Sequence, residues 1–299
     1  MGTIISLTLF QNRPQVVTTV YQYLVDAEKK FSANNDNSEI MRINQSAGIR
    51  PVSVSPAVFD LIKRAVMYSK KFPNSFNVAI GPLVKLWDIG FSGQRVPSAT
   101  EIRQKLKAVA ITGIELNESQ LQVYLKYPGM AIDLGAIAKG YFADQIAFQL
   151  KRWGIKDAII DLGGNVVTLG HNQLAKNSDW QIGIQDPKKT RGEILGKVQL
   201  PACSAVTSGI GERNFKVRDK FYHHIISPRT GYPVENDVAQ VTIFSPSSIQ
   251  GEVLATVAFF AGITAGQQLV KQTPNVAAIF VTRAGEIKLT SGLNFKKIA

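Results

Sequence analysis

The chain has 299 residues, of which 45% are hydrophobic, enough to bury a large core in one big domain or in two fused units. Its formal net charge of +12 favours an anionic partner, but the basic residues stand in ones and twos, without a basic helix or a series of aromatic platforms, which argues against nucleic acid. The single cysteine, Cys203, excludes an internal disulfide and a cysteine-rich metal site.

The N-terminus lacks the basic start and long apolar core of a signal peptide, and no run approaches the ~18 to 20 apolar residues of a membrane span. From the sequence as it stands we expect a cytoplasmic protein. If an export signal has been removed before residue 1, the expected place is the outer face of a membrane. Membrane association is expected only through an anchor that this sequence does not contain.

The first third of the chain alternates strand and helix patterns. Residues 3–10 predict a strand, and helical spacing of apolar residues predicts helices over 14–31 and 56–72. A further helix is predicted to open at Pro97 and run to residue 109. The alternation over residues 120–127 indicates a hairpin strand.

Residues 74–91 form a strongly apolar segment with few charges, which glycine and proline interrupt. Such a segment is typical of a buried loop or of the wall of a pocket. The alternative is a core turn held by Trp87, because a large aromatic side chain needs burial.

The stretch from residue 131 to 153 predicts a short strand, a glycine turn and a helix with a stop at Gly154. Backbone N–H groups at the helix entrance, residues 135–140, have no intrahelical partner and stand at the positive end of the dipole. The junction therefore suits an anionic ligand, and Lys139 adds a full charge. The alternative is an ordinary strand-to-helix connection with a solvated lysine, since small residues also serve tight packing.

After this helix, residues 157–170 predict two strands joined by paired glycines, which permit either close approach to a ligand or simply a tight turn. Strands at 180–185 and 197–200 and a polar turn at 204–215 are expected next. The neighbours His223 and His224 follow, and in an alternating strand only one of them faces a given side. One of the two histidines is therefore a candidate for a functional site, and the alternative is that both are structural.

The C-terminal part predicts a strand at 240–246, a helix at 249–262 and a closing hairpin. Glu252 and Thr256 lie four residues apart on that helix, so both side chains leave the same face and can converge on one cation as oxygen ligands. The alternative is a surface carboxylate beside a helix-interior threonine. Each half of the chain has strands followed by helices and further strands, which suits two related α+β units in tandem.

Eight short sequence motifs follow one another along the chain. They are MGT at residues 1–3, SEIMRIN at 38–44, GPLVKLW at 81–87, DLGAIAKGY at 133–141, DLGGN at 161–165, TSG at 207–209, HHIISPRTGYPV at 223–234 and LAT at 254–256. Together they resemble the ApbE family of FAD:protein FMN transferases over nearly the whole length. Several ordered motifs are far more specific than any single glycine loop.

The resemblance implies an α+β fold with tandem units related to the tunnelling fold (T-fold). The expected organisation is one flavin transferase domain over residues 1–299, or two fused α+β units with a boundary near 130–160. The implied enzyme depends on Mg²⁺, splits FAD, joins FMN through its phosphate to a threonine or serine hydroxyl of a target flavoprotein and releases AMP. Its rivals are an FAD pyrophosphatase that yields FMN and AMP, and a flavin-binding protein that has lost its activity.

The family pattern also implies residue roles. His224 and Lys139 are the expected catalytic residues, with His224 as general base or phosphate contact and Lys139 on phosphate oxygens. The metal is expected at the Ala136 carbonyl, Glu252 and Thr256. The expected FAD contacts are Met1, Asn34, Ser75, Phe76, Asn77, Asp133, Lys139 and Ile226.

Several positions depart from the family pattern. Where aspartate is usual, this chain has Asn77, Asn165, Ile210, Ser227 and Glu252, and an aromatic residue is usual at Asn34. Glu252 keeps the charge on a longer side chain, so metal binding is expected to persist with shifted geometry. The loss of the other acids either weakens the metal and the deprotonation step or strengthens binding of the anionic pyrophosphate by removing repulsion.

Overall fold

The structure, a computed structural model, describes residues 3–175 and 178–298. These residues form two compact units, and each unit is assembled from separate stretches of the chain. Unit 1 contains Tyr23–Ala136 and Glu212–Glu235, and unit 2 contains residues 3–22, 137–211 and 236–298. Both units combine helices with antiparallel sheets, so the predicted α+β class is confirmed. The relation to the tunnelling fold stays a prediction.

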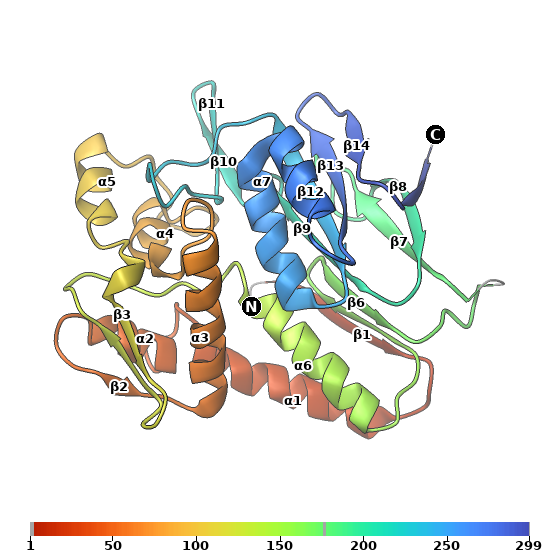
Figure 1. Cartoon of the computed structure of the whole chain (residues 1–299), viewed down its shortest axis with the longest axis horizontal. Coiled ribbons are helices and arrows are strands. Elements are labelled where there is room, and N and C mark those ends of the chain that lie inside the picture. The colour runs from red at the N-terminus through yellow and green to blue at the C-terminus, as the bar shows by residue number, and fades with distance from the viewer. Residues whose placement is uncertain (1–2, 176–177, 299) are drawn as a thin grey trace. The chain divides into compact units, whose positions relative to one another are not determined.

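Unit 2 is built on a seven-stranded antiparallel sheet with the strand order β1-β5-β6-β9-β12-β13-β14. Its strands are β1 (Ile5–Leu9), β5 (Ala158–Leu162), β6 (Asn165–Leu169), β9 (Ser204–Gly209), β12 (Val238–Ser245), β13 (Ala277–Thr282) and β14 (Ile287–Leu289). Two helices, α6 (Ala138–Arg152) and α7 (Ser248–Lys271), lie side by side against this sheet (Figure 1). A smaller sheet of β15 (Asn294–Lys297), β8 (Ile194–Leu200) and β7 (Trp180–Gln185) shares a hydrophobic cluster with it.

Strand β12 is the centre of this packing. All eight of its residues are buried, because both faces of the sheet are covered. Phe244 packs in the cluster that includes Ile182 of β7 and Val198 of β8. Val241 and Ile243 alternate with it and so point to the opposite face, which α7 covers.

Helices α6 and α7 cap each other's first turn. The Asp144 carboxylate of α6 accepts hydrogen bonds from Ser248 N and Ile249 N at the start of α7, at 2.7 and 3.0 Å. In return, Oε2 of Glu252 on α7 accepts from Gly140 N near the start of α6, at 2.6 Å. One N–H group at the start of α6 and two at the start of α7 are thereby satisfied across the helix pair.

A close approach between the two helices makes this arrangement possible. A Cβ added to Gly140 would lie 2.5 Å from the Ser248 carbonyl oxygen and 2.7 Å from Ile249 Cα, both backbone atoms that cannot yield. The glycine of the predicted helix entrance therefore serves close packing against α7. The predicted stop is also confirmed, since α6 ends at Arg152 and Gly154 has a φ of +76°.

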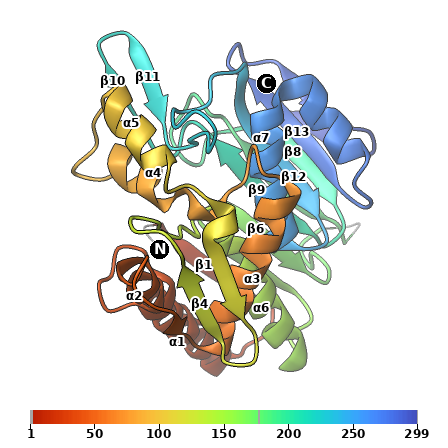
Figure 2. The same cartoon turned by 60° about the vertical axis from the view of Figure 1, so that its left-hand side comes forward.

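Unit 1 contains a three-stranded sheet, a group of helices and a separate hairpin (Figure 2). The sheet has the order β2-β4-β3, with β2 (Val52–Ser53), β4 (Gln122–Leu125) and β3 (Ile114–Asn117); the hairpin is β10 (Asn214–Val217) with β11 (Lys220–His223). The helices are α2 (Glu39–Gln45), α3 (Pro56–Lys71), α4 (Gly81–Trp87), α5 (Ala99–Leu106) and the short η1 (Val78–Ile80) and η2 (Ile111–Gly113). Helix α1 (Pro14–Phe31) has residues in both units.

Trp87 organises one core of unit 1. It is fully buried with Leu83, Ile102 and Ile226 in one hydrophobic cluster. Its Nε1–H donates to the Gly231 carbonyl at 2.8 Å, which ties α4 to the turn after Ile226. The expected role of Trp87 in the core is confirmed, although residues 78–87 form η1 and α4 where a buried loop was expected.

Most predicted helices agree closely with the structure, whereas several other local predictions were wrong or incomplete. Residues 131–134 form no strand, and the expected polar turn at 204–215 contains β9, in the interior of the main sheet. Helix α2 was missed, although Ser38 caps it by accepting from Met41 N at 2.9 Å. Short elements carry too little periodicity for their sequence to separate helix, strand and turn.

Helix α7 is the one helix among the described residues that is long and apolar enough to cross a membrane, by length and composition only. The expectation that no such run exists was therefore too strict. Its apolar side chains have another use here, because Val253, Leu254 and Val257 are buried and the helix packs on β9 and β12. A buried core helix can be as long and as apolar as a membrane-spanning helix, so length and composition do not separate the two.

Candidate functional site

The expected site residues divide between the two units. Asn34, Ser75, Phe76, Asn77, Asp133, Ala136, His224 and Ile226 belong to unit 1, whereas Lys139, Glu252 and Thr256 belong to unit 2. Met1 lies outside the described residues.

Asp133 stands on an irregular segment that unit 1 holds at both backbone and side-chain level. The Asp133 N–H donates to the Val78 carbonyl at 2.9 Å. The Asn44 side chain accepts from Ile132 N at 2.7 Å and donates to the Ile132 carbonyl at 3.0 Å. These bonds satisfy polar backbone groups of residues 132 and 133, which belong to no sheet.

The carboxylate of Asp133 is half-buried, and its Oδ1 accepts from Gly135 N at 2.8 Å. Burial raises the pKa of Asp133 above its ordinary value, while the Gly135 hydrogen bond and the charge of Arg213 act in the opposite direction. A half-buried carboxylate with a raised pKa is costly to keep ionised, which is typical of a functional position.

The segment beside Asp133 carries three of the expected FAD contacts. Asn77 caps η1, since its Oδ1 accepts from Ala79 N at 2.9 Å. Phe76 is buried edge-to-face against Tyr68, with 6.4 Å between the ring centroids, so most of its ring serves the core. Ser75 is half-buried. Asn34 lies exposed in the loop before α2, where its N–H donates to Ser32 Oγ at 3.2 Å.

The neighbouring histidines have different surroundings. His223 is buried and its Nε2 lies 2.9 Å from the Val234 carbonyl oxygen, which indicates a structural role. His224 is half-buried, and both its N–H and its ring Nδ1 lie 3.2 Å from the Arg213 carbonyl oxygen. A ring Nδ1 that donates to a carbonyl leaves the lone pair of a neutral imidazole on Nε2. Of the two histidines, His224 is the one whose side chain is not buried.

In unit 2, Lys139 and Glu252 form a direct ion pair. Lys139 Nζ lies 2.7 Å from Glu252 Oε1, and the exposed fractions of the two side chains are 34% and 4%. The other carboxylate oxygen accepts from Gly140 N. The solvated lysine and the surface carboxylate that were weighed as alternatives are therefore wrong, because Lys139 is paired and Glu252 is buried inside unit 2.

The oxygen atoms of this region suit Mg²⁺ by their chemistry. The Glu252 carboxylate has two acceptor oxygens with several lone-pair positions. One turn later, Thr256 Oγ1 donates to the Glu252 carbonyl at 3.3 Å. Such hard oxygen ligands are the ones that Mg²⁺ takes, and Lys139 is the cation that balances Glu252 in this structure. Within residues 3–175 and 178–298, no three His, Cys, Asp or Glu side chains gather as a ready-made metal cluster.

Three of the positions where aspartate was expected retain local roles that need no charge. The Ser227 Oγ accepts from Arg229 N at 3.3 Å and from Thr230 N at 3.2 Å, which fixes the turn after His224. Asn165 is fully buried and its Oδ1 accepts from Ser248 Oγ at 2.6 Å. Like Asn77, these side chains supply the acceptor oxygen that an aspartate would supply, without the cost of a buried charge.

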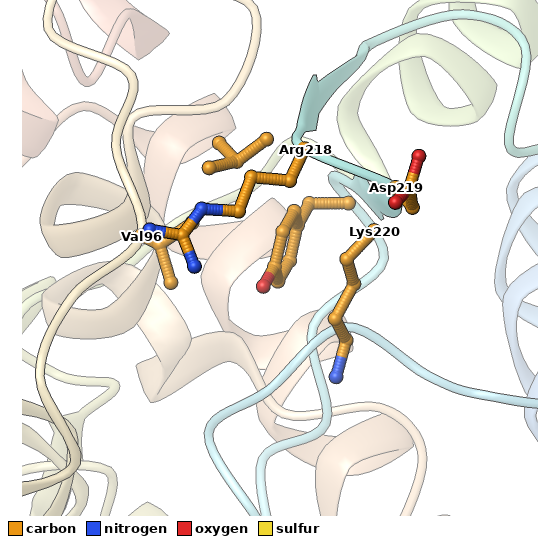
Figure 3. Close-up of a pocket in the computed structure, with 6 residues that line it drawn as sticks. Val96, Arg218, Asp219 and Lys220 are labelled. Atoms are coloured by element: carbon orange, nitrogen blue, oxygen red, sulfur yellow. The ribbon is translucent and has the colours of Figure 1, made fainter.

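A separate hollow of about 590 Å³ lies at the tip of the β10–β11 hairpin (Figure 3). Val96, Arg218, Lys220 and Tyr222 line it, and Lys220 is paired with Glu235 at 3.2 Å. None of the expected site residues lines this hollow.

The sequence patterns also gave no role to Arg213, whose carbonyl oxygen lies 3.2 Å from the ring Nδ1 of His224 in the structure.

Known proteins resemble this chain over nearly its full length. A family model described as "ApbE family" matches residues 1–280. An FAD:protein FMN transferase of Klebsiella pneumoniae is 40% identical, over 97% of this chain and 90% of that protein. Another of Treponema pallidum is 34% identical, over 98% of this chain and 85% of that protein.

Solved structures show the same fold. The ApbE protein of Thermotoga maritima is 27% identical and matches with a TM-score of 0.83, covering 97% of this chain and 93% of its own. The flavin transferase ApbE of Vibrio cholerae is 25% identical, with a TM-score of 0.82 and coverages of 97% and 94%.

We predict that Asp133→Asn stabilises the protein at pH 7. Because the folded pKa is raised above 3.8, ionising Asp133 costs folding free energy at neutral pH, and the cost disappears as the pH falls below that value. The variant's midpoint in urea should exceed that of the wild type at pH 7, and the gap should shrink towards pH 4. Exposed Asp36→Asn is the control. A gap that does not change with pH would refute the assignment.

We predict that Lys139 and Glu252 are energetically coupled. In a double-mutant cycle with Lys139→Met and Glu252→Gln, the coupling energy from urea unfolding should be on the order of 1 kcal/mol or more, because Glu252 is desolvated. The matched control is the exposed pair Lys63 and Glu118, 2.8 Å apart, whose coupling should be near zero. Equal coupling in the two cycles would contradict the prediction.

Proposed function

The chain belongs to the ApbE family, and from this premise we propose that it transfers FMN from FAD to a hydroxyl group of a target flavoprotein and releases AMP. The activity is the one for which its relatives are named, so the protein is a transferase with FAD as its substrate. The observation that carries the proposal is the 40% identity to an FAD:protein FMN transferase over 97% of this chain. FAD and the acceptor flavoprotein are its proposed partners.

The proposed reaction is a phosphoryl-type transfer. A threonine or serine oxygen of the acceptor attacks the phosphorus of the FMN half, an O–P bond forms, and the P–O bond to AMP breaks. The hydroxyl proton passes to His224, for which the tautomer set by the Arg213 carbonyl leaves Nε2 as the acceptor. The electron pair of the broken bond leaves on AMP.

The remaining roles follow from charge and ligand chemistry. Lys139 and the N-terminus of α6 are proposed to hold phosphate oxygens. In this proposal the Lys139 ammonium group leaves the Glu252 carboxylate and pairs with a phosphate of FAD. Glu252, Thr256 and the Ala136 carbonyl are proposed to hold Mg²⁺. When bound, the ion would neutralise the charge of the pyrophosphate. Asp133 and the other expected FAD contacts, Met1, Asn34, Ser75, Phe76, Asn77 and Ile226, are proposed to bind the remainder of FAD.

The transfer itself gives the sharpest test. The protein is incubated with FAD, Mg²⁺ and an acceptor flavoprotein domain, and the acceptor mass, AMP and free FMN are measured. We expect FMN attached to the acceptor, no transfer in EDTA and recovery with added Mg²⁺. AMP together with free FMN would replace the proposal with FAD hydrolysis. FAD that is bound but intact would exclude both reactions.

We predict that His224→Ala slows turnover far more than it weakens FAD binding. Removing a general base costs on the order of 10² to 10⁴ in rate, whereas the ground-state contacts to FAD remain. Single-turnover transfer and FAD titration measure the two effects separately. His171→Ala, an exposed histidine of unit 2, is the control. Unchanged turnover in His224→Ala would remove this residue from the mechanism.

A further inference from the structure

Arg213 has a side chain that unit 1 holds in place. Its stem passes directly over Gly90: a Cβ added to Gly90 would lie 2.7 Å from Arg213 Cδ and 2.9 Å from Cγ. Gly90 also has a φ of +85°, a conformation that residues with a side chain rarely adopt. The guanidinium carbon lies 5.1 Å from the centroid of the Phe91 ring. A glycine and an aromatic face therefore fix the path of an otherwise flexible side chain.

The charge of Arg213 is accessible, and the contact recorded for it is with the Phe91 ring. The residue is exposed, and it forms no ion pair with any acidic residue that the structure describes. Its field reaches Asp133, where it lowers the pKa that burial raises. A fixed, unpaired guanidinium with its planar set of N–H donors is the group that best matches phosphate oxygens.

The backbone of the same residue orients the proposed base. The Arg213 carbonyl accepts from both the N–H and the ring Nδ1 of His224, each at 3.2 Å. Residue 213 thus serves two groups of unit 1 at once: the imidazole through its carbonyl and Asp133 through its charge. A substitution of the side chain leaves the carbonyl in place, so the two roles can be separated by experiment.

We propose that the Arg213 guanidinium binds phosphate oxygens of FAD next to His224. The inference rests on the proposed function. During transfer, the O–P bond to the acceptor forms, the P–O bond to AMP breaks and the hydroxyl proton moves to His224. Arg213 then offsets negative charge on the phosphates at the reacting end of FAD. Its position near Asp133 also reduces the repulsion between that carboxylate and the anionic substrate.

The test compares two flavins that differ in phosphate. Binding of FAD and of riboflavin is measured by fluorescence titration for the wild type, Arg213→Met and Arg213→Lys. A charged hydrogen bond to phosphate predicts at least a tenfold loss of FAD affinity in Arg213→Met, with riboflavin affinity unchanged. Arg213→Lys should recover part of the loss. Arg218→Met, which changes an exposed arginine in the turn between β10 and β11, should bind both flavins as the wild type does.

A second variant keeps the charge of Arg213 and removes the aromatic ring beneath its guanidinium. Phe91→Leu should weaken FAD affinity about threefold, again without an effect on riboflavin, because the cation–π contact is lost while the guanidinium remains. An equal loss for FAD and riboflavin in Arg213→Met, or no loss for either, would overturn the proposal.

The transfer assay separates this inference from the proposed function. A wild type that transfers FMN, with Arg213→Met equal to it in FAD binding, contradicts the inference alone. A wild type that transfers nothing, with the selective loss of FAD affinity in Arg213→Met, contradicts the proposed function and supports the phosphate contact.

Discussion

A buried carboxylate between two helices is the constraint on which unit 2 depends. Glu252 has 4% of its side chain exposed, and a charge so placed is costly unless it is paired and hydrogen-bonded. Lys139 and Gly140 N satisfy it, and both belong to the first turn of α6. That requires α6 and α7 to approach within backbone contact, which only a glycine at position 140 permits. Packing, capping and the charge at the proposed phosphate site therefore have one common origin.

Unit 1 follows a different principle, in which irregular backbone is held by side chains. Asn44 bonds both polar backbone groups of Ile132, and Trp87 bonds the Gly231 carbonyl from within the core. Asp133 and His224 stand on segments of this kind, where a functional group can be presented without a helix or strand. Several acids that the family pattern expects are replaced by neutral acceptors such as Asn77 and Ser227. The local turns keep their hydrogen bonds without the cost of a further buried charge.

Elements with strong periodicity were predictable from the sequence, and elements fixed by distant partners were not. Helices α1 and α3 match their predicted bounds within a residue, because amphipathic spacing and Pro14 or Pro56 at the start define them locally. The segment before Gly135 was read as a strand on its apolar character, but its partners are Val78 and Asn44, far away in sequence. Strand β9 was missed because its polar residues, such as Ser204 and Thr207, are made compatible with the interior only by neighbouring strands.

The sequence by itself determined the family, the α+β class and which residue types are available for the chemistry, because ordered motifs and helical spacing are local properties. Only the tertiary structure decided how these residues are used. It paired Lys139 with Glu252, which are 113 positions apart. It also buried His223 in the core and placed the ring of His224 against the Arg213 carbonyl. It also gave Arg213 an aromatic support that no spacing indicates. Burial, ion pairing and tautomer choice depend on neighbours that only the folded chain brings together.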